Sequence, residues 1–133
     1  MNDLLLKEGL TCIIYKDGII YKSKERGVKP LLSLIEQGIS LDGFSSVDKV
    51  VGKAAAFLYL ILGVSNIHAH IISEHAYNLL ILNNINVTFD KMVSFIENRT
   101  KNGRCPMESA VLNINNKSDA LIAIKNKLLE MRG

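Results

Sequence analysis

The stretch SVDKVVGKAAAFLYLILG, Ser46–Gly63, decides the fold of this chain. From Ala54 onward it is apolar on every side, which predicts a central helix covered by other elements rather than a surface helix. Ser46 is a typical N-cap, Asp48 suits the positive end of a helix, and Gly63 is a typical stop. The sequence therefore predicts one helix from Ser46 to Gly63 whose polar first turns face something outside the core.

Strand and helix patterns alternate along the rest of the chain. Residues 11–24, TCIIYKDGIIYKSK, predict a β-hairpin because two β-branched runs flank Asp17-Gly18, a dipeptide preferred in tight turns. The further predicted elements are a helix over 28–38 ended by Gly38, a strand over 66–73, a helix over 73–84 capped by Ser73, a strand over 85–89, a helix over 90–98 started by Asp90, a short helix started by Pro106, and a helix over 118–132 capped by Ser118.

This order of elements predicts a single α/β domain over residues 1–133, with a mixed β-sheet flanked by helices on both faces in three layers. In such sheets the ligand crevice lies beyond the carboxyl ends of the parallel strands, where the following helices begin. We therefore expect the helix starts at Ser46 and Ser73 to face one crevice. Because helix amino ends attract negative charge, the crevice should favour an anionic ligand.

Composition and charge limit which kinds of molecule the protein is expected to bind. A net charge of +3 is compatible with an anionic small molecule, but it is too weak and scattered to indicate nucleic acid. The longest apolar run, Ala54–Leu62, is too short to span a bilayer, and the first residues lack the features of a signal peptide. Two cysteines do not make a disulfide framework. We expect a cytoplasmic protein with a small-molecule ligand, no nucleic-acid or membrane partner, and edge strands that could pair copies into a homo-oligomer.

A second informative stretch is NGRCPMESAV, residues 102–111. In a functional interpretation, Arg104, Arg99 and the following short helix lower the pKa of the Cys105 thiol. Cys105 would then be a nucleophile or redox group, with Glu108 as its proton-transfer partner. In a structural interpretation, Cys105 is a partly buried residue at a loop–helix junction, and Glu108 returns a capping-box bond to it. The sequence leaves both interpretations open.

The other candidate site residues fall at the two expected helix starts. Lys53 lies where its helix turns apolar, so its ammonium must reach a partner or lose its charge, and it could hold an anion or act as a base. Gly52 would allow a ligand to approach closely, and Asp48 lies in the polar first turn. Ser73 and Glu74 form an ordinary cap and first-turn carboxylate, yet the same junction would line the crevice.

Two histidines in the predicted strand over 66–73 are candidate metal ligands. His68 and His70 share one strand face, and two histidines can bind a metal in that arrangement. A third ligand is not apparent from the sequence, so a hydrogen-bonded or exposed pair is the simpler hypothesis. We therefore predict no metal and no cofactor.

The runs YKDGIIYKSKERGVKPLL, DKVVGKAAAFLYLILG, AHIISE and NGRCPMESAV together resemble a prokaryotic family known as domain of unknown function 1893, over about residues 5–128. The resemblance implies a cytidine deaminase-like fold with a strand-strand-helix-strand-helix-strand core. In zinc deaminases a His or Cys with a nearby Glu begins one helix and Pro-Cys-x-x-Cys begins the next. We match these starts to residues 51–55 and 73–77, which lack the three ligands a zinc site needs. The resemblance thus implies the fold without zinc-dependent deaminase chemistry.

These observations favour a small-molecule-binding domain for a nucleotide-like or other anionic metabolite. The residues expected to contact the anion are Asp48, Gly52, Lys53, Ser73, Glu74, Arg99 and Arg104. The alternative is a metal-independent enzyme with Cys105 as nucleophile or redox thiol and with Glu108 or Lys53 as its proton-transfer partner. A third hypothesis is a structural or interaction protein whose edge strands pair subunits.

Overall fold

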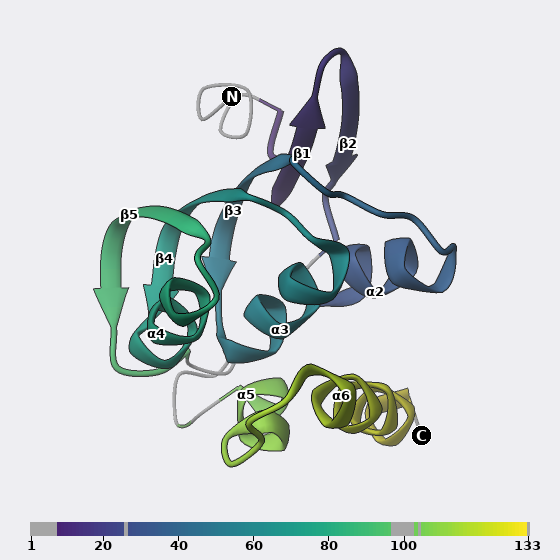
Figure 1. Ribbon diagram of the computed structural model, residues 1–133. Helices are drawn as coiled ribbons and strands as arrows, with labels where there is room; N and C mark the ends of the chain where they lie inside the picture. The colour runs from purple at the N-terminus through teal and green to yellow at the C-terminus, as the bar shows by residue number, and fades with distance from the viewer. Residues whose placement is uncertain (1–7, 26, 97–102, 104, 133) are drawn as a thin grey trace.

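The computed structural model of the chain describes residues 8–25, 27–96, 103 and 105–132. These residues form a five-stranded mixed sheet of order β2-β1-β3-β4-β5 together with five helices (Figure 1). Strand β1 pairs antiparallel with β2 and β3, whereas β3, β4 and β5 are parallel. The elements are β1 Cys12–Lys16, β2 Ile19–Ser23, α2 Lys29–Glu36, β3 Ser45–Val51, α3 Lys53–Leu62, β4 Asn66–Ser73, α4 Glu74–Leu82, β5 Asn86–Val93, α5 Pro106–Val111 and α6 Lys117–Arg132.

Turn and capping residues in the sequence predicted the positions of several elements correctly. The predicted hairpin is confirmed, because Asp17 and Gly18 both have positive φ, 46° and 87°, as the favoured two-residue turn requires. Helix α4 begins as predicted, with the Ala76 N–H donating to the Ser73 hydroxyl at 3.2 Å. Pro106 opens α5 as predicted. Capping and turn signals that depend on a few adjacent residues therefore predicted these elements correctly.

The predicted helix from Ser46 is wrong in its first part. Ser45–Val51 is strand β3, and α3 begins only at Lys53, with Gly52 as its N-cap. Valines make up three of the seven residues of this strand, and their branched side chains favour a strand over the first turns of a helix. Asp48 consequently lies in the middle of a strand and not at the start of a helix.

The predicted helix starting at Asp90 is also wrong, because β5 runs on through that residue to Val93. Parallel pairing with β4 continues as far as Ser73↔Val93, so pairing with a strand distant in sequence overrides the local helix signal. The last helix is capped by Asn116 and not by Ser118. The Asp119 N–H donates to the side-chain oxygen of Asn116 at 2.8 Å.

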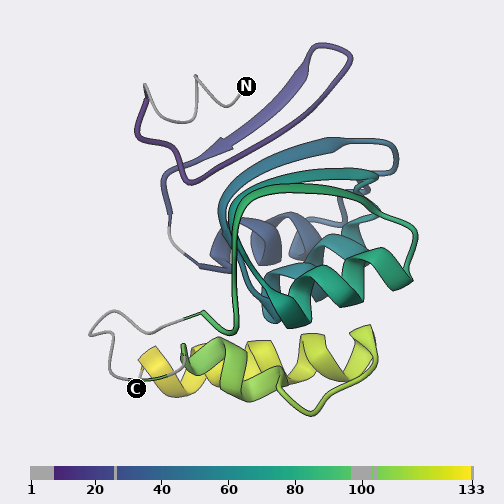
Figure 2. The same ribbon diagram turned by 90° about the vertical axis from the view of Figure 1, so that its left-hand side faces the viewer.

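All five described helices lie on the same side of the sheet, in two layers (Figures 1 and 2). Helices α2, α3 and α4 pack next to the sheet, and α5 and α6 cover α3 from the far side. The prediction of helices on both faces is therefore wrong for the described part of the chain. Strands β3, β4 and β5 follow one another in a single direction, so right-handed crossovers place α3 and α4 on one face.

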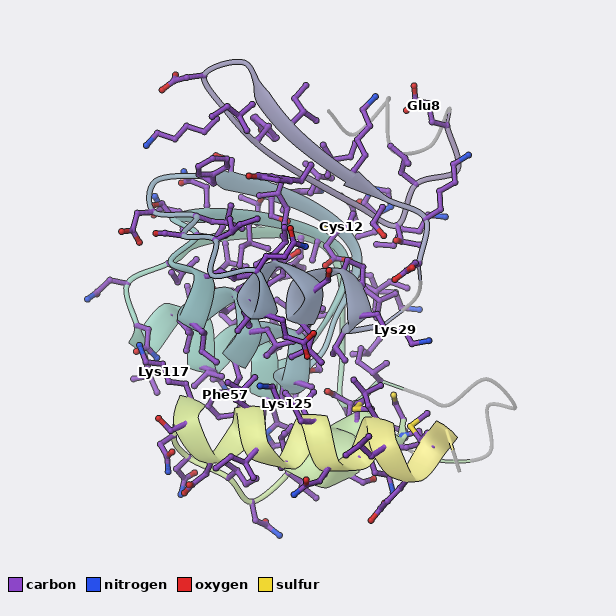
Figure 3. All side chains as sticks on the ribbon, turned by 90° about the vertical axis from the view of Figure 1, so that its right-hand side faces the viewer. Glu8, Cys12, Lys29, Phe57, Lys117 and Lys125 are labelled. Atoms are coloured by element: carbon purple, nitrogen blue, oxygen red, sulfur yellow. The ribbon has the colours of Figure 1, made fainter. Side chains whose placement is uncertain are left out.

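Helix α3 is the centre of the protein, as its all-round apolar sequence predicted. Ala54, Ala56, Leu58 and Tyr59 have no exposed surface, although they point in different directions around the helix. Figure 3 shows Phe57 between the inner helices and α6. In the part of the chain that the structure describes, no helix is long and apolar enough to cross a membrane.

Candidate functional site

The amino end of α3 holds the carboxylate of Glu108, which comes from α5. Backbone N–H groups of Lys53 and Ala54 donate to the two oxygens of this carboxylate at 2.7 and 3.0 Å. Glu108 is only 7% exposed, so these charge-assisted bonds are shielded from water. A helix amino end attracts an anion, and the chain supplies one itself.

Gly52 makes this contact possible. Its backbone is extended, with φ −97° and ψ 179°, a conformation open to any residue. A Cβ atom at this position would, however, collide with the carboxylate of Glu108. The close approach predicted at Gly52 is thus real, but the group that approaches belongs to the protein.

The side chain of Lys53 completes a clamp on α5. Its ammonium donates to the carbonyl of Leu112, the residue at the end of α5, at 2.9 Å and lies 5.7 Å from the centroid of the Phe57 ring. Partial burial lowers the pKa of Lys53, and the negative charge of Glu108 opposes that shift. The structure therefore brings Gly52, Lys53 and Glu108 together, as predicted site residues, in an arrangement that fixes one helix against another.

Cys105 lies at the N-cap position of α5 without a side-chain capping bond. Its backbone N–H donates to the carbonyl of Ile96 at 2.8 Å, and its partly exposed side chain packs against the main core. Glu108 does not form the predicted capping box with it, because both carboxylate oxygens face α3. Arg99 and Arg104, the predicted activating residues, lie outside the described residues.

Ser73 and Glu74 behave as an ordinary helix start. The Ser73 side chain is fully buried and is used to cap α4, while Glu74 is exposed. The starts of α3 and α4 do follow neighbouring parallel strands, which end at the pair Val51↔Ile72 and at Ser73. The two helix starts are adjacent, but the first lies at Lys53 and not at Ser46 as predicted, and the Glu108 carboxylate and the Ser73 hydroxyl already accept from N–H groups of α3 and α4.

Asp48 belongs instead to a set of polar side chains between the sheet and α3. The Tyr59 hydroxyl donates to a carboxylate oxygen of Asp48 at 2.7 Å and lies 2.7 Å from the hydroxyl of Ser46. The Cys12 sulfur lies 3.4 Å from the same Tyr59 hydroxyl. We call Cys12, Ser46, Asp48 and Tyr59 the polar cluster. It stands in a core that is otherwise mainly aliphatic.

Burial controls the protonation of this polar cluster. It raises the pKa of Asp48 to about 6, although the hydrogen bond from Tyr59 works in the opposite direction. Burial, reinforced by the charge of Asp48, raises the pKa of Cys12 to about 12. The pKa of Tyr59 is raised well above 10 for the same two reasons. Asp48 is therefore the member of the cluster whose charge can change near neutral pH.

The sequence contains a signal for this cluster. Ser46 and Asp48 are two residues apart, so they share a face if the segment is a strand, and Tyr59 carries the only hydroxyl of α3. The helix predicted over this segment concealed that Ser46 and Asp48 share a face.

A surface groove of about 260 Å³ lies between the hairpin and α2, and Cys12 forms part of its wall. Figure 3 shows Cys12 between these two elements. Because the Cys12 sulfur also contacts Tyr59, the polar cluster extends from the core to the groove. Other residues that line the groove are Tyr21, Lys22 and Glu25 on the hairpin side and Pro30 and Ser33 of α2.

One group of side chains in the described residues has the composition of a metal site. Ligand atoms of His68, His70 and Asp90 all lie within 4.8 Å of one another. The third ligand that the sequence did not reveal comes from β5, because Asp90 lies in a strand beside β4 and not in a helix.

Comparison with known proteins identifies relatives without a described activity. The family model described as a domain of unknown function (DUF1893) matches residues 1–128. A similar solved structure is the crystal structure of a DUF1893 family protein from Thermotoga maritima, with a TM-score of 0.88 and 28% sequence identity over 95% of this chain and 86% of that chain. No curated protein matches the chain.

Proposed function

We propose that this chain, which belongs to the DUF1893 family, is a small-molecule-binding domain whose ligand occupies the groove between the hairpin and α2. The observation that carries the proposal is the polar cluster that reaches this groove through Cys12. Polar and ionisable side chains are costly to bury even when they are paired, and aliphatic residues could fill the same space. A polar cluster in which Cys12, Ser46 and Tyr59 are buried, and which opens on a groove, supports a binding role.

The chemistry of the groove favours a small polar metabolite with negative charge, such as a nucleotide-like compound. Lys22, whose ammonium pairs with the exposed Glu8 at 3.3 Å, lies on the groove wall, and an anionic ligand would compete with Glu8 for it; the net charge of +3 is compatible with such a ligand. Glu25 and Ser33 offer hydrogen-bonding groups for hydroxyl or amino substituents. This groove is not the site predicted from the sequence, the start of α3, because Glu108 occupies the place expected for an anion there.

A cytidine deaminase-like fold without deaminase chemistry is part of the same proposal. The order from β1 to β4 is strand-strand-helix-strand-helix-strand, as that superfamily requires. With β3 in place, the two helix starts that match the zinc-ligand positions are residues 28–31 and 51–55, and not 51–55 and 73–77. Their sequences, VKPL and VGKAA, contain no Cys or His, whereas a catalytic zinc site needs three protein ligands.

The proposal also places the protein in the cytoplasm, which the two free thiols, Cys12 and Cys105, support. The predicted alternative, an enzyme with Cys105 as nucleophile, is less well supported. Glu108, its expected proton-transfer partner, has both oxygens engaged by α3. A homo-oligomer paired through the edge strands β2 and β5 stays a prediction.

The test is a titration followed by NMR, with backbone amide signals of the full chain and a panel of nucleosides, nucleotides and sugar phosphates. We expect the shifts for a binding compound to cluster on β1, β2 and α2. Ser33→Trp, which fills the exposed rim of the groove, should weaken that binding by at least about 10-fold. Ser118→Trp, at an exposed position on α6, is the matched control and should bind normally. Equal binding by both variants would refute the groove as the site.

A further inference from the structure

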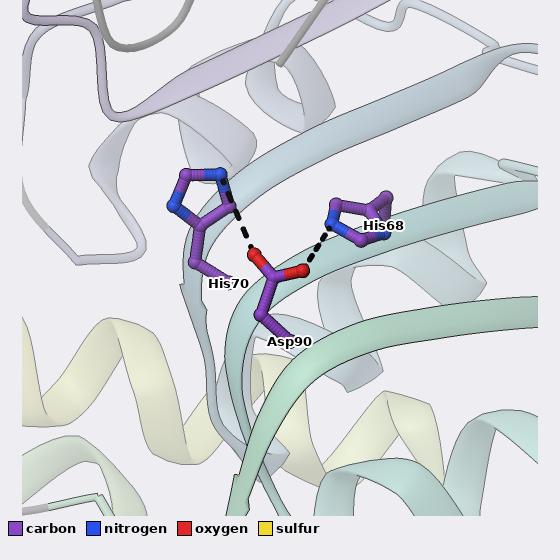
Figure 4. A group of neighbouring side chains, drawn as sticks. All are labelled: His68, His70 and Asp90. Atoms are coloured by element: carbon purple, nitrogen blue, oxygen red, sulfur yellow. Dashed lines mark ion pairs between the residues drawn. The ribbon is translucent and has the colours of Figure 1, made fainter.

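The face of the sheet opposite the five described helices carries a compact group of ligand-type side chains. His68 and His70 are two residues apart on β4, so they project from the same face. Asp90 lies beside them on β5, between the strand pairs Ala69↔Phe89 and Ile71↔Lys91. Asp90 oxygens lie 3.3 Å from Nε2 of His68 and 4.0 Å from Nε2 of His70, and the three side chains converge in Figure 4.

The ring of His68 is held in the orientation that a metal ligand needs. Its Nδ1 is 2.7 Å from the hydroxyl of Thr88, the residue paired with it on β5. A proton on Nδ1 that is donated to Thr88 leaves a lone pair on Nε2, directed at Asp90. Among the buried side-chain nitrogen and oxygen atoms of the described residues, this Nε2 is the one without a hydrogen bond. A lone pair facing a carboxylate is repulsive unless a proton or a cation lies between them.

We propose that His68, His70 and Asp90 bind one divalent transition-metal ion such as Zn²⁺. Two imidazoles and one carboxylate suit Zn²⁺, Co²⁺ or Ni²⁺ rather than Mg²⁺ or Ca²⁺, which prefer oxygen ligands. Ligands around a tetrahedral Zn²⁺ lie roughly 3.3 Å apart, given bonds of ~2.0–2.1 Å. The distance from His68 to Asp90 already has this value, and Nε2 of His70 would have to approach Asp90 by less than about 1 Å.

The neighbouring residues determine how tightly the site should bind a metal ion and whether water can reach it. The two imidazoles are about one-fifth exposed and the Asp90 side chain is 58% exposed, so a fourth position can be filled by water. Lys49 of β3 lies beside His70, between the pairs Asp48↔Ala69 and Val50↔Ile71. A nearby lysine opposes a cation, so we expect a dissociation constant of about 1–10 µM rather than the much tighter binding of structural zinc sites.

The test is calorimetric titration of the full, metal-free chain with Zn²⁺ alone and with Co²⁺ alone. We expect one ion per chain, and binding at least about 10-fold weaker in His70→Ala and Asp90→Asn. Thr88→Val, which keeps all three ligands but removes the partner of Nδ1, should also weaken binding by about 10-fold. His75→Ala removes the remaining histidine, which is exposed on α4, and should leave binding unchanged.

Absorption of the Co²⁺-loaded wild-type chain tests the site without depending on the fold of any variant. Four-coordinate Co²⁺ bound by nitrogen and oxygen should show strong visible bands without thiolate-to-metal charge transfer. A thiolate band would assign the metal to Cys12 or Cys105 and overturn the proposal. Failure to bind either metal at ~100 µM, or normal binding by Asp90→Asn, would overturn it as well. The groove proposal is not affected by any of these results, because it concerns the opposite face of the sheet.

Discussion

Replacing Glu108 should test the clamp between α3 and α5 most directly. Glu108→Ala leaves the N–H groups of Lys53 and Ala54 buried without their acceptor. Each buried donor left unsatisfied costs about 1–3 kcal/mol, and the carboxylate also loses its interaction with the helix amino end. Since water can enter part of the space that the removed side chain leaves, we expect a loss of about 2–4 kcal/mol in the free energy of unfolding. That is a large fraction of the ~5–15 kcal/mol typical of a single domain.

Urea denaturation followed by circular dichroism measures this loss, and a thermal scan should show the melting temperature falling by roughly 10 °C. The control is Glu130→Ala on α6, whose side chain is 69% exposed and pairs with Lys127 at 3.2 Å. An exposed pair contributes little, so this variant should stay within about 0.5 kcal/mol of wild type. The same small effect in Glu108→Ala would refute the clamp.

A double-mutant cycle with Gly52 separates the contact from a general effect on stability. Gly52→Ala should be costly in the wild-type chain, because the new methyl group collides with the Glu108 carboxylate while the backbone itself is unstrained. In the Glu108→Ala background the colliding group is gone. We therefore expect the cost of Gly52→Ala to fall by at least about 1 kcal/mol in that background. Additive effects would show that the two residues do not meet.

Three further predictions concern the titratable and thiol groups. Burial raises the pKa of Asp48 from 3.8 to about 6, so between these pH values the folded state binds a proton that the unfolded state does not bind. The free energy of unfolding should therefore fall as pH rises from about 4 to about 6, by at most about 3 kcal/mol. Asp48→Asn, which still accepts from Tyr59, should lose that pH dependence in urea denaturation, and an unchanged slope would contradict the assignment. Mass spectrometry after brief alkylation of the native chain should find Cys105 modified well before Cys12, because Cys12 is buried with its pKa raised to about 12. Cys105→Ala should leave any ligand-induced rise in melting temperature within about a degree, whereas loss of that rise would favour the enzyme hypothesis.

Features that depend on short-range chemistry were predictable from the sequence. The Asp17-Gly18 turn, the Ser73 cap and the buried character of α3 each follow from a few adjacent residues. Strands β3 and β5 were misassigned because their stability comes from pairing with β4, which is distant in sequence. Ser46 and Asp90 carry helix-start signals of their own, and this non-local pairing overrides them.

Individual residues of the candidate site were predictable from the sequence, but the contacts between them were not. Gly52, Lys53 and Glu108 were each singled out, yet the sequence separation of 55 residues between Lys53 and Glu108 concealed that they contact one another. The polar cluster and the third ligand-type side chain, Asp90, were hidden by the same two misassigned strands. Side-chain partners across a sheet depend on register, which a single sequence does not determine.

The position of β3 has consequences for every functional hypothesis about this chain. With Ser45–Val51 as a strand, the polar residues expected at the mouth of a crevice turn inward, where Asp48 meets Tyr59. The helix amino end that could have held an anionic ligand is closed by Glu108, so an anion could enter there only by displacing the carboxylate that fixes α5. The entering anion would accept from the two N–H groups, but the displaced carboxylate would lose both bonds and one end of the clamp would be released, at a cost in free energy. A ligand in the groove meets no such cost, and binding there is therefore the stronger hypothesis.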